Sequence, residues 1–237
     1  MSDRMAHRGP DDDGVFEHRR GQISVQLAHR RLSIIDLSEA GHQPFSRHGL
    51  TLTYNGELYN YRSIRAELTS QGVRFTTSSD TEVVLEAWRR WGPGALARFR
   101  GMFAFAIFDD HTGRLALARD HLGIKPIHYL RRKDGVIFAS ELKSLVAAVG
   151  HELSADPATL VASILFYWVP PARCAIRGIE KLPPGSWAEF APDGTHSVRS
   201  YWSIAEVAAE AAGAKPVDLR QVIEESVAAH LVSDVPI

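Results

Sequence analysis

The tripeptide Asn55-Gly56-Glu57 combines hydrogen-bond donors and an acid at the end of an alternating apolar-polar run. An asparagine amide and a glycine N–H can both donate to one developing oxyanion, and glycine lets a substrate approach the backbone closely. The Glu57 carboxylate can accept hydrogen bonds from an ammonium group. The same residues also fit an ordinary β-turn followed by a solvated acid, because Asn-Gly is common in tight turns. These three residues alone leave both interpretations open.

Two other positions carry charges of opposite sign. Arg30-Arg31 lies between two predicted strands, where a guanidinium can hold a carboxylate through two parallel hydrogen bonds. The alternative is a pair of exposed cations at a strand edge. Asp80 stands at the start of a predicted helix, where it can bind an ammonium group or only stabilise the helix N-terminus.

The remaining polar groups do not point to a further site. Asp11-Asp12-Asp13 lacks the ligand spacing of a calcium loop and indicates a solvated turn. The eleven histidines show no pair at metal spacing on one helix face, so we expect no metal site. The single cysteine, Cys174, excludes an intrachain disulfide and is interpreted as a small apolar filler. The sequence has no phosphate loop of the GxxxxGK-Ser/Thr type.

Composition is that of an ordinary globular protein. Of the 237 residues, 45% are hydrophobic and 23% are charged, which is enough apolar side chain for a packed core. The net charge of −1 gives no general attraction to nucleic acid or to a membrane surface. No apolar run approaches the roughly 20 residues that span a bilayer. The lone cysteine and the lack of an apolar signal region favour the cytoplasm.

Hydrophobic periodicity predicts strands and helices in mixed order. Strands are expected at 23–27, 32–37, 50–54, 102–108, 114–118, 127–130 and 136–139, with two more within 179–202. Helices are expected at 61–71, 81–91, 141–149, 157–166, 205–214 and 219–231. Residues 1–20 are interpreted as polar chain with turns, and Ser79 and Glu82 have the spacing of a capping box. The hairpin-like connections favour an α+β fold with antiparallel sheets.

Nine short motifs connect these pieces. In order they are HRGPD at 7–11, HRRLSIIDL at 29–37, GHQP at 41–44, YNGELYN at 54–60, SDTE at 79–82, GMFAFA at 101–106, ARDHLGIKP at 118–126, FASELK at 138–143 and KLPPG at 181–185. Together they resemble the glutaminase domain, a class II glutamine amidotransferase, of glutamine-hydrolysing asparagine synthetases. The last two favour asparagine synthetases over other class II amidotransferases.

The resemblance implies an N-terminal-nucleophile (Ntn) hydrolase fold, an αββα sandwich of two antiparallel sheets. It implies that Arg31 binds the glutamine carboxylate, that Asn55 and Gly56 form the oxyanion hole, and that Glu57 and Asp80 hold the ammonium group. The backbone next to Arg31 would form the pocket wall at Leu32, Ser33, Ile34 and Ile35. The glutaminase domain would cover 1–203. Residues 204–237 would be a linker and the first helix of a synthetase domain.

Two departures from the family pattern lead us to expect a fragment, truncated at both ends. The family's nucleophile is an N-terminal cysteine, followed by a strand and a helix before the His-Arg-Gly-Pro motif. Here that motif begins at residue 7, so we expect the first strand, the first helix and the nucleophile to be absent, with Ser2 a poor substitute. Ser-Asp-Val-Pro at 233–236 resembles the opening of the synthetase domain, and its ATP-gripping loop is not reached.

The family reaction is ATP-dependent conversion of aspartate to asparagine with ammonia from glutamine. We expect L-glutamine and a synthetase domain as partners, no cofactor in this chain, and ATP and Mg²⁺ in the synthetase domain. We expect no glutaminase activity from the chain by itself, and association into a homodimer or through an unpaired sheet edge. Two alternatives remain: a non-catalytic glutamine-binding or assembly module, and an amidotransferase domain for another acceptor, such as a peptide-tailoring or β-lactam-forming relative.

Overall fold

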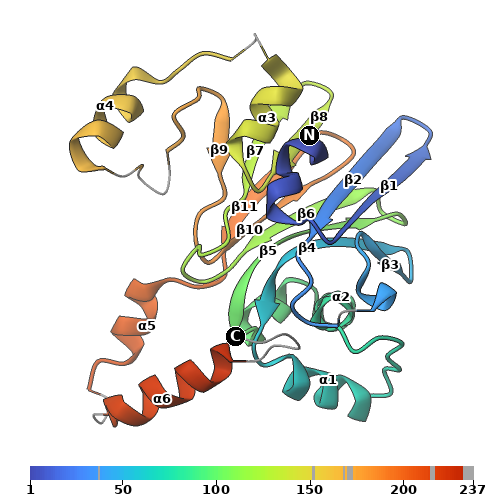
Figure 1. Ribbon diagram of the computed structural model, residues 1–237, viewed down its shortest axis with the longest axis vertical. Coiled ribbons are helices and arrows are strands. Elements are labelled where there is room, and N and C mark those ends of the chain that lie inside the picture. Colours follow the sequence, from blue (N-terminus) through green and yellow to red (C-terminus); the bar gives the residue numbers. More distant parts are fainter. Residues whose placement is uncertain (37, 151–152, 168, 170–172, 214–216, 232–237) are drawn as a thin grey trace.

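The computed structural model describes residues 1–36, 38–150, 153–167, 169, 173–213 and 217–231, and these form helices and antiparallel strands in mixed order (Figure 1). In chain order the elements are η1 (Ser2–Arg8), β1 (Asp12–Arg20), β2 (Ile23–Arg31), η2 (Glu39–Gly41), β3 (Phe45–Arg47), β4 (Leu50–Leu58), α1 (Tyr61–Ser70), α2 (Asp80–Trp91), η3 (Gly92–Arg98), β5 (Gly101–Asp109), β6 (Arg114–Arg119), β7 (His128–Arg132), β8 (Gly135–Ala139), α3 (Leu142–Val149), α4 (Pro157–Phe166), β9 (Ile179–Lys181), β10 (Ser186–Phe190), β11 (His196–Ser200), α5 (Ile204–Glu210) and α6 (Leu219–His230).

The central element is a six-stranded antiparallel sheet in the order β11-β10-β6-β5-β4-β3. Its strand β5 is buried on both faces, because successive side chains of a strand point to opposite sides. Phe103 and Phe105 join the core cluster on one face, and Ala104 and Ala106 join the cluster on the other. The nearly continuous apolar run of β5 therefore places it in the middle of a sandwich.

Helices α1 and α2 cover one face of this sheet, and a second layer of strands covers the other (Figure 1). Ile64 of α1 and Val83 of α2 pack with the Phe103 side of β5. Leu27 of β2 and Tyr129 of β7 pack with the Ala104 side. Beyond the second layer, Leu145 of α3 packs in a third cluster with residues of β8 and β9. The layers run helix, sheet, sheet, helix, and the expected α+β sandwich is confirmed.

The second strand layer consists of two separate sheets. One is the hairpin of β1 and β2, and the other has the order β8-β7-β9. In the part of the chain that the structure describes, β2 pairs with β1 alone, and β8 pairs with β7 alone. Helix η1 lies beside the gap, in contact with both β2 and α3. The gap is the place where the candidate site opens.

Several predicted elements are confirmed within one or two residues, among them α1, α2, β6, β8, α4 and α6. Of the two contacts of the predicted capping box, the one from Ser79 is confirmed and the one from Glu82 is wrong. The Ser79 hydroxyl accepts from the Thr81 N–H, as a cap does, at 3.1 Å. The Glu82 carboxylate instead accepts from Thr76 and Thr77, because the chain before the helix folds back over it.

Other expectations are wrong because tertiary pairing overrides local pattern. The polar segment 1–20 contains β1, which pairs with β2 along its whole length. The predicted strand at 32–37 is a loop over its described residues 32–36. The stretch 179–202 holds three strands and not two. Asn55-Gly56 is no turn, since β4 runs through it without a break and pairs with β5.

Helices α5 and α6 follow the sandwich and keep their apolar side chains exposed. Val222, Ile223 and Val227 of α6 are 46%, 53% and 55% exposed. The end of α6 contacts the sandwich through the His230 ring, whose centroid lies 4.3 Å from that of Tyr59. The described helices include none long and apolar enough to cross a membrane.

Candidate active site

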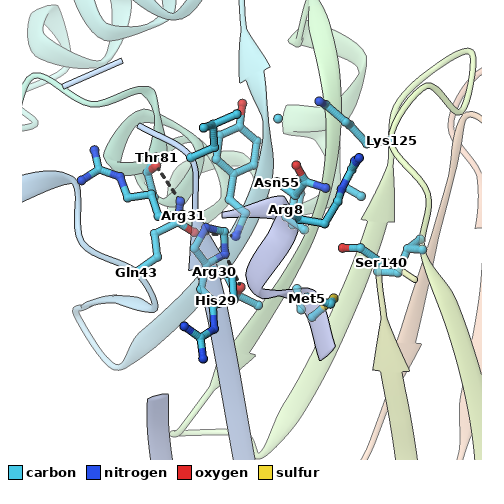
Figure 2. A pocket seen from close by; sticks show the side chains of 18 of the residues that line it. Met5, Arg8, His29, Arg30, Arg31, Gln43, Asn55, Thr81, Lys125 and Ser140 are labelled. Carbon is cyan, nitrogen blue, oxygen red and sulfur yellow. Dashed lines mark hydrogen bonds between the residues drawn. The ribbon is translucent and has the colours of Figure 1, made fainter. Parts of the chain in front are cut away.

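A cavity of about 450 Å³ lies between β2 and β8, with β4 and β5 as its floor (Figure 2). The side walls come from Ala28–Arg31 and Phe138–Ser140, and η1 closes part of the mouth with Met5, His7 and Arg8. In the view of Figure 2, Arg31, Gln43 and Thr81 lie on one side, Lys125 and Ser140 on the other, and Asn55 between them.

Arg31, the last residue of β2, forms the basic end of the cavity. Its side chain is buried, and Nη1 donates to the Ser38 carbonyl at 3.1 Å. Nη2 donates to the carbonyls of Ile35, at 3.3 Å, and Asp36. Three of the five N–H groups therefore shape the loop that follows β2. Arg31 is also one of the residues that line the cavity, so its guanidinium brings a positive charge to that side.

Glycine is required nearby because the guanidinium fills the space beside the loop. A Cβ atom at Gly41 would lie 2.0 Å from Nη2 of Arg31. The neighbouring Arg30 is different, since it donates to Ser2 Oγ at 3.1 Å and pairs with Asp3 at 2.9 Å. The alternative of two exposed cations at a strand edge is therefore wrong for both residues, since the Arg30 side chain is 21% exposed and paired and Arg31 is buried.

Asn55, Gly56 and Glu57 stand on the regular strand β4. Gly56 is needed for close packing and not for a turn, because a Cβ atom there would lie 2.2 Å from the Met102 carbonyl oxygen. Glu57 is half-buried, and burial raises the pKa of its carboxyl, against the opposing charges of Lys125 and His230. A carboxylate in this setting gains from a ligand cation.

Asp80, the first residue of α2, is the buried acid among the lining residues, and its surroundings form the acidic end of the cavity. It is buried, and its Oδ2 accepts from the Tyr54 hydroxyl at 2.9 Å and the Leu58 N–H at 3.0 Å. Burial raises the pKa of this carboxyl to about 6, against the hydrogen bonds from Leu58 and Tyr54, and the charge of Glu57 adds to the rise. The cap position belongs to Ser79, so Asp80 is left to face the strand and the cavity.

The cavity brings together eight of the nine predicted site residues. They are Arg31, Leu32, Ile34, Ile35, Asn55, Gly56, Glu57 and Asp80. Ser33 is not among the lining residues, and its backbone N–H donates to Asp11 Oδ2 at 2.8 Å. The predicted roles of these residues remain predictions, but their gathering in one cavity is a fact of the structure.

Sequence reasoning missed Gln43 and Lys125. Gln43 is buried, accepts from the Tyr54 N–H at 2.7 Å and donates to Thr81 Oγ1 at 3.4 Å, so it links β4 to α2 in the wall. Lys125 places a cation in the same cavity as Glu57. Gln43 lies in the motif GHQP and Lys125 in the motif ARDHLGIKP, so their place in these motifs could have identified them.

The cavity contains neither of the two side chains considered as nucleophile. Cys174 is buried in the third core cluster with Leu145 and Ile179, as expected of an apolar filler. Ser2 accepts from Arg30 outside the lining. The described residues form no group of three histidine, cysteine or acidic side chains that could hold a metal ion.

Comparison with known proteins agrees with this geometry. The model of the "Glutamine amidotransferase domain" family matches residues 1–202. The chain is 39% identical to asparagine synthetase [glutamine-hydrolyzing] 1 of Bacillus subtilis and 35% identical to asparagine synthetase B [glutamine-hydrolyzing] of Escherichia coli, with 100% of the chain covered in each case. It spans 37% of the length of each of these relatives.

A solved structure supports the fold. Glutamine phosphoribosylpyrophosphate amidotransferase from B. subtilis, complexed with ADP and GMP, matches at a TM-score of 0.55 and 22% identity, over 75% of this chain and 35% of that one. The sandwich of two antiparallel sheets between helical layers thus has the fold of an Ntn-type amidotransferase domain. The chain belongs to the glutamine amidotransferase domain family. Its relatives at 35–39% identity are glutamine-hydrolysing asparagine synthetases.

Proposed function

We propose that this cavity binds L-glutamine and belongs to the ammonia-supplying part of an ATP-dependent asparagine synthase. One observation carries the proposal: a single cavity is lined by a buried guanidinium, two carboxylates and an amide donor. An α-amino acid needs a cation for its carboxylate and acids for its ammonium group. Arg31 is assigned the first task, and Glu57 and Asp80 are assigned the second.

The amide end of glutamine is assigned to Asn55 and Gly56 on β4. An asparagine N–H and a backbone N–H on a rigid strand are suited to a tetrahedral oxyanion, because they need little reorganisation when the charge develops. The burial of Glu57 and Asp80 supports the same placement. Their raised pKa values fall when a ligand ammonium approaches, so ligand binding is coupled to ionisation of the site.

For the 237-residue chain by itself we propose glutamine binding without turnover. Amide hydrolysis in this class requires a nucleophile near the oxyanion donors, and Cys174 lies in a different cluster. Incubation of the purified chain with glutamine should release no glutamate. Glutamate release that Asn55→Ala abolishes would overturn this part of the proposal.

The synthetase chemistry is assigned to the part of such enzymes that this chain does not span. The relatives are named as asparagine synthetases, and ATP and Mg²⁺ would serve that part. The chain has no phosphate loop, and its described residues offer no metal cluster, so no step of ATP chemistry is assigned to it. We propose that 204–237 belongs to the synthetase side, which fits the exposed apolar residues of α6. We also propose that the protein pairs as a homodimer.

The experiment that tests glutamine binding is a calorimetric titration of the purified chain. Asp80→Asn removes the buried negative charge from the acidic end. Asp134→Asn makes the same chemical change on a hairpin where the side chain is 87% exposed. Heat of binding that disappears in the first variant and persists in the second supports the site. Equal binding in both variants would place the ligand elsewhere.

A further inference from the structure

Asp36 does not line the cavity, yet its carboxylate joins the two segments that carry Arg31 and Asp80. We propose that Asp36 is a positioning residue that sets the separation between these two side chains, and with it the fit of the cavity to an α-amino acid. The inference rests on the proposed glutamine site and adds a residue that holds the site together without touching the ligand.

The first contacts of Asp36 lie within its own loop. Its Oδ1 accepts from the Ser38 N–H at 3.2 Å and from the Ser38 hydroxyl at 2.5 Å. The carbonyls of Asp36 and Ser38 both accept from the Arg31 guanidinium. The Arg31 side chain and the Asp36 carboxylate therefore hold the same loop. Arg31 donates to its carbonyls, and the Asp36 carboxylate accepts from the N–H and hydroxyl of Ser38.

The second contacts of Asp36 cross to a distant part of the chain. Its Oδ2 accepts from the Ser78 N–H at 3.2 Å and from the Ser78 hydroxyl at 2.9 Å, over a separation of 42 residues. Ser78 directly precedes the helix cap Ser79 and then Asp80. These two bonds fix the start of α2 relative to the loop that Arg31 shapes.

A second carboxylate holds the other side of that segment. Glu82 is fully buried and accepts from the N–H and hydroxyl of Thr77 at 2.7 and 2.8 Å, and from the Thr76 N–H at 3.0 Å. Glu82 belongs to the same helix as Asp80 and so anchors the segment within its own element. Asp36 supplies the connection to the loop that Arg31 shapes.

Burial and backbone both suit Asp36 to this task. Only 6% of the residue is exposed. Burial raises the pKa of its carboxyl, but the hydrogen bonds from Ser38 and Ser78 outweigh burial, so the net pKa is lowered and the group is ionised at neutral pH. Its φ of 55° lies in the left-handed region, which asparagine also tolerates. Asp36→Asn therefore removes the charge and one acceptor oxygen without new backbone strain.

The test compares two ligands, L-glutamine and glutaramate, which is glutamine with hydrogen in place of the ammonium group. Both are titrated by NMR into wild type, Asp36→Asn, Ser78→Ala and Ser70→Ala. Ser70 is the matched control, since its hydroxyl donates only to the Glu67 carbonyl on the exposed side of α1. We expect Asp36→Asn and Ser78→Ala each to lower the ratio of glutamine to glutaramate affinity about tenfold, the value of a hydrogen bond to a charged group.

A purely stabilising role would weaken both ligands by the same factor. A ratio unchanged from wild type and Ser70→Ala would therefore overturn the proposal. Amide hydrogen exchange without ligand provides an independent measurement, in which Asp36→Asn should speed exchange at both Ser38 and Ser78. Faster exchange at one of them, or at neither, would disprove the link. If wild type binds neither ligand, the glutamine assignment fails, and the exchange result alone decides the role of Asp36.

Discussion

The two ends of the cavity are built in different ways. The basic end depends on an irregular loop, in which Arg31 satisfies carbonyls of residues 35, 36 and 38. The acidic end depends on regular structure, with Asp80 at the first position of α2 and bonded to β4. An irregular loop that depends on side-chain bonds loses its shape when those bonds are removed, whereas a helix and a strand persist. We therefore expect a substitution of Arg31 to weaken both ligand binding and folding. A substitution of Asp80 should weaken ligand binding alone.

The largest effect is expected at the basic end. Arg31→Ala removes the carboxylate partner and leaves one buried carbonyl, of Asp36, and two part-buried ones without their donor. We expect the glutamine affinity to fall at least about 100-fold and the free energy of unfolding to fall by about 2–3 kcal/mol. Calorimetry and denaturant unfolding measure the two quantities. Arg31→Lys keeps the charge but cannot make the three bonds, so it should restore little. A free energy of unfolding in Arg31→Ala equal to that of wild type would contradict the proposed difference between the two ends.

At the acidic end, binding and folding should separate. Asp80→Asn keeps an acceptor for Tyr54 and Leu58 but removes the charge that meets the ammonium group. We expect about 30-fold weaker binding, as for loss of one partner of a buried charge pair. Stability at neutral pH should not fall, because the raised pKa shows that ionised Asp80 destabilises the fold. A large loss of stability in the same denaturant assay would show that this end is no less fragile than the other.

The pH dependence of binding should report Asp80. Its pKa of about 6 in the free protein means that the carboxyl gains a proton as pH falls below that value. Because an ammonium ligand needs the ionised form, the glutamine affinity should fall about tenfold per pH unit below pH 6 and be flat between pH 7 and 8. Folding depends on pH in the opposite direction. As pH rises above the pKa of an unfolded aspartate, the raised pKa of Asp80 lowers the free energy of unfolding, and this loss is complete above pH 6. Asp80→Asn should flatten both profiles.

The smallest effect is expected at Glu57. This acid is half-buried and already faces the charges of Lys125 and His230, so its attraction to a ligand cation is shared and partly screened. Glu57→Gln should weaken glutamine by only about threefold. A loss equal to that of Asp80→Asn in the same titration would show that both acids contact the ammonium group with similar strength.

Local pattern was sufficient where burial is one-sided or complete. The apolar run of β5 and the amphipathic stripes of α1 and α2 could be predicted because their periodicity records which side faces the core. Five residues of the cavity could be singled out from their chemistry, but only the resemblance favoured a common site for them and added residues 32–35. Seen one at a time, Arg31 and Asp80 could equally have been a surface cation and a helix cap.

Local pattern failed where distant partners decide the structure. The strand β1 exists because β2 pairs with it residue by residue, and its own sequence is mostly polar. The Asn55-Gly56 pair stays extended because β5 pairs on one side and leaves no room for a Cβ atom at Gly56. The loop after Arg31 is set by bonds to its own carbonyls and, through Asp36, to Ser78. None of these partners can be read from neighbouring positions.

The most direct test of the account is one calorimetric titration of the 237-residue chain with L-glutamine at neutral pH, repeated with Arg31→Ala, Asp80→Asn and Asp134→Asn. We expect one glutamine bound per chain in wild type and Asp134→Asn, with an affinity at least about 100-fold lower in Arg31→Ala and about 30-fold lower in Asp80→Asn. Absence of binding to wild type, or binding that survives the loss of both Arg31 and Asp80, would contradict the assignment of this cavity to glutamine.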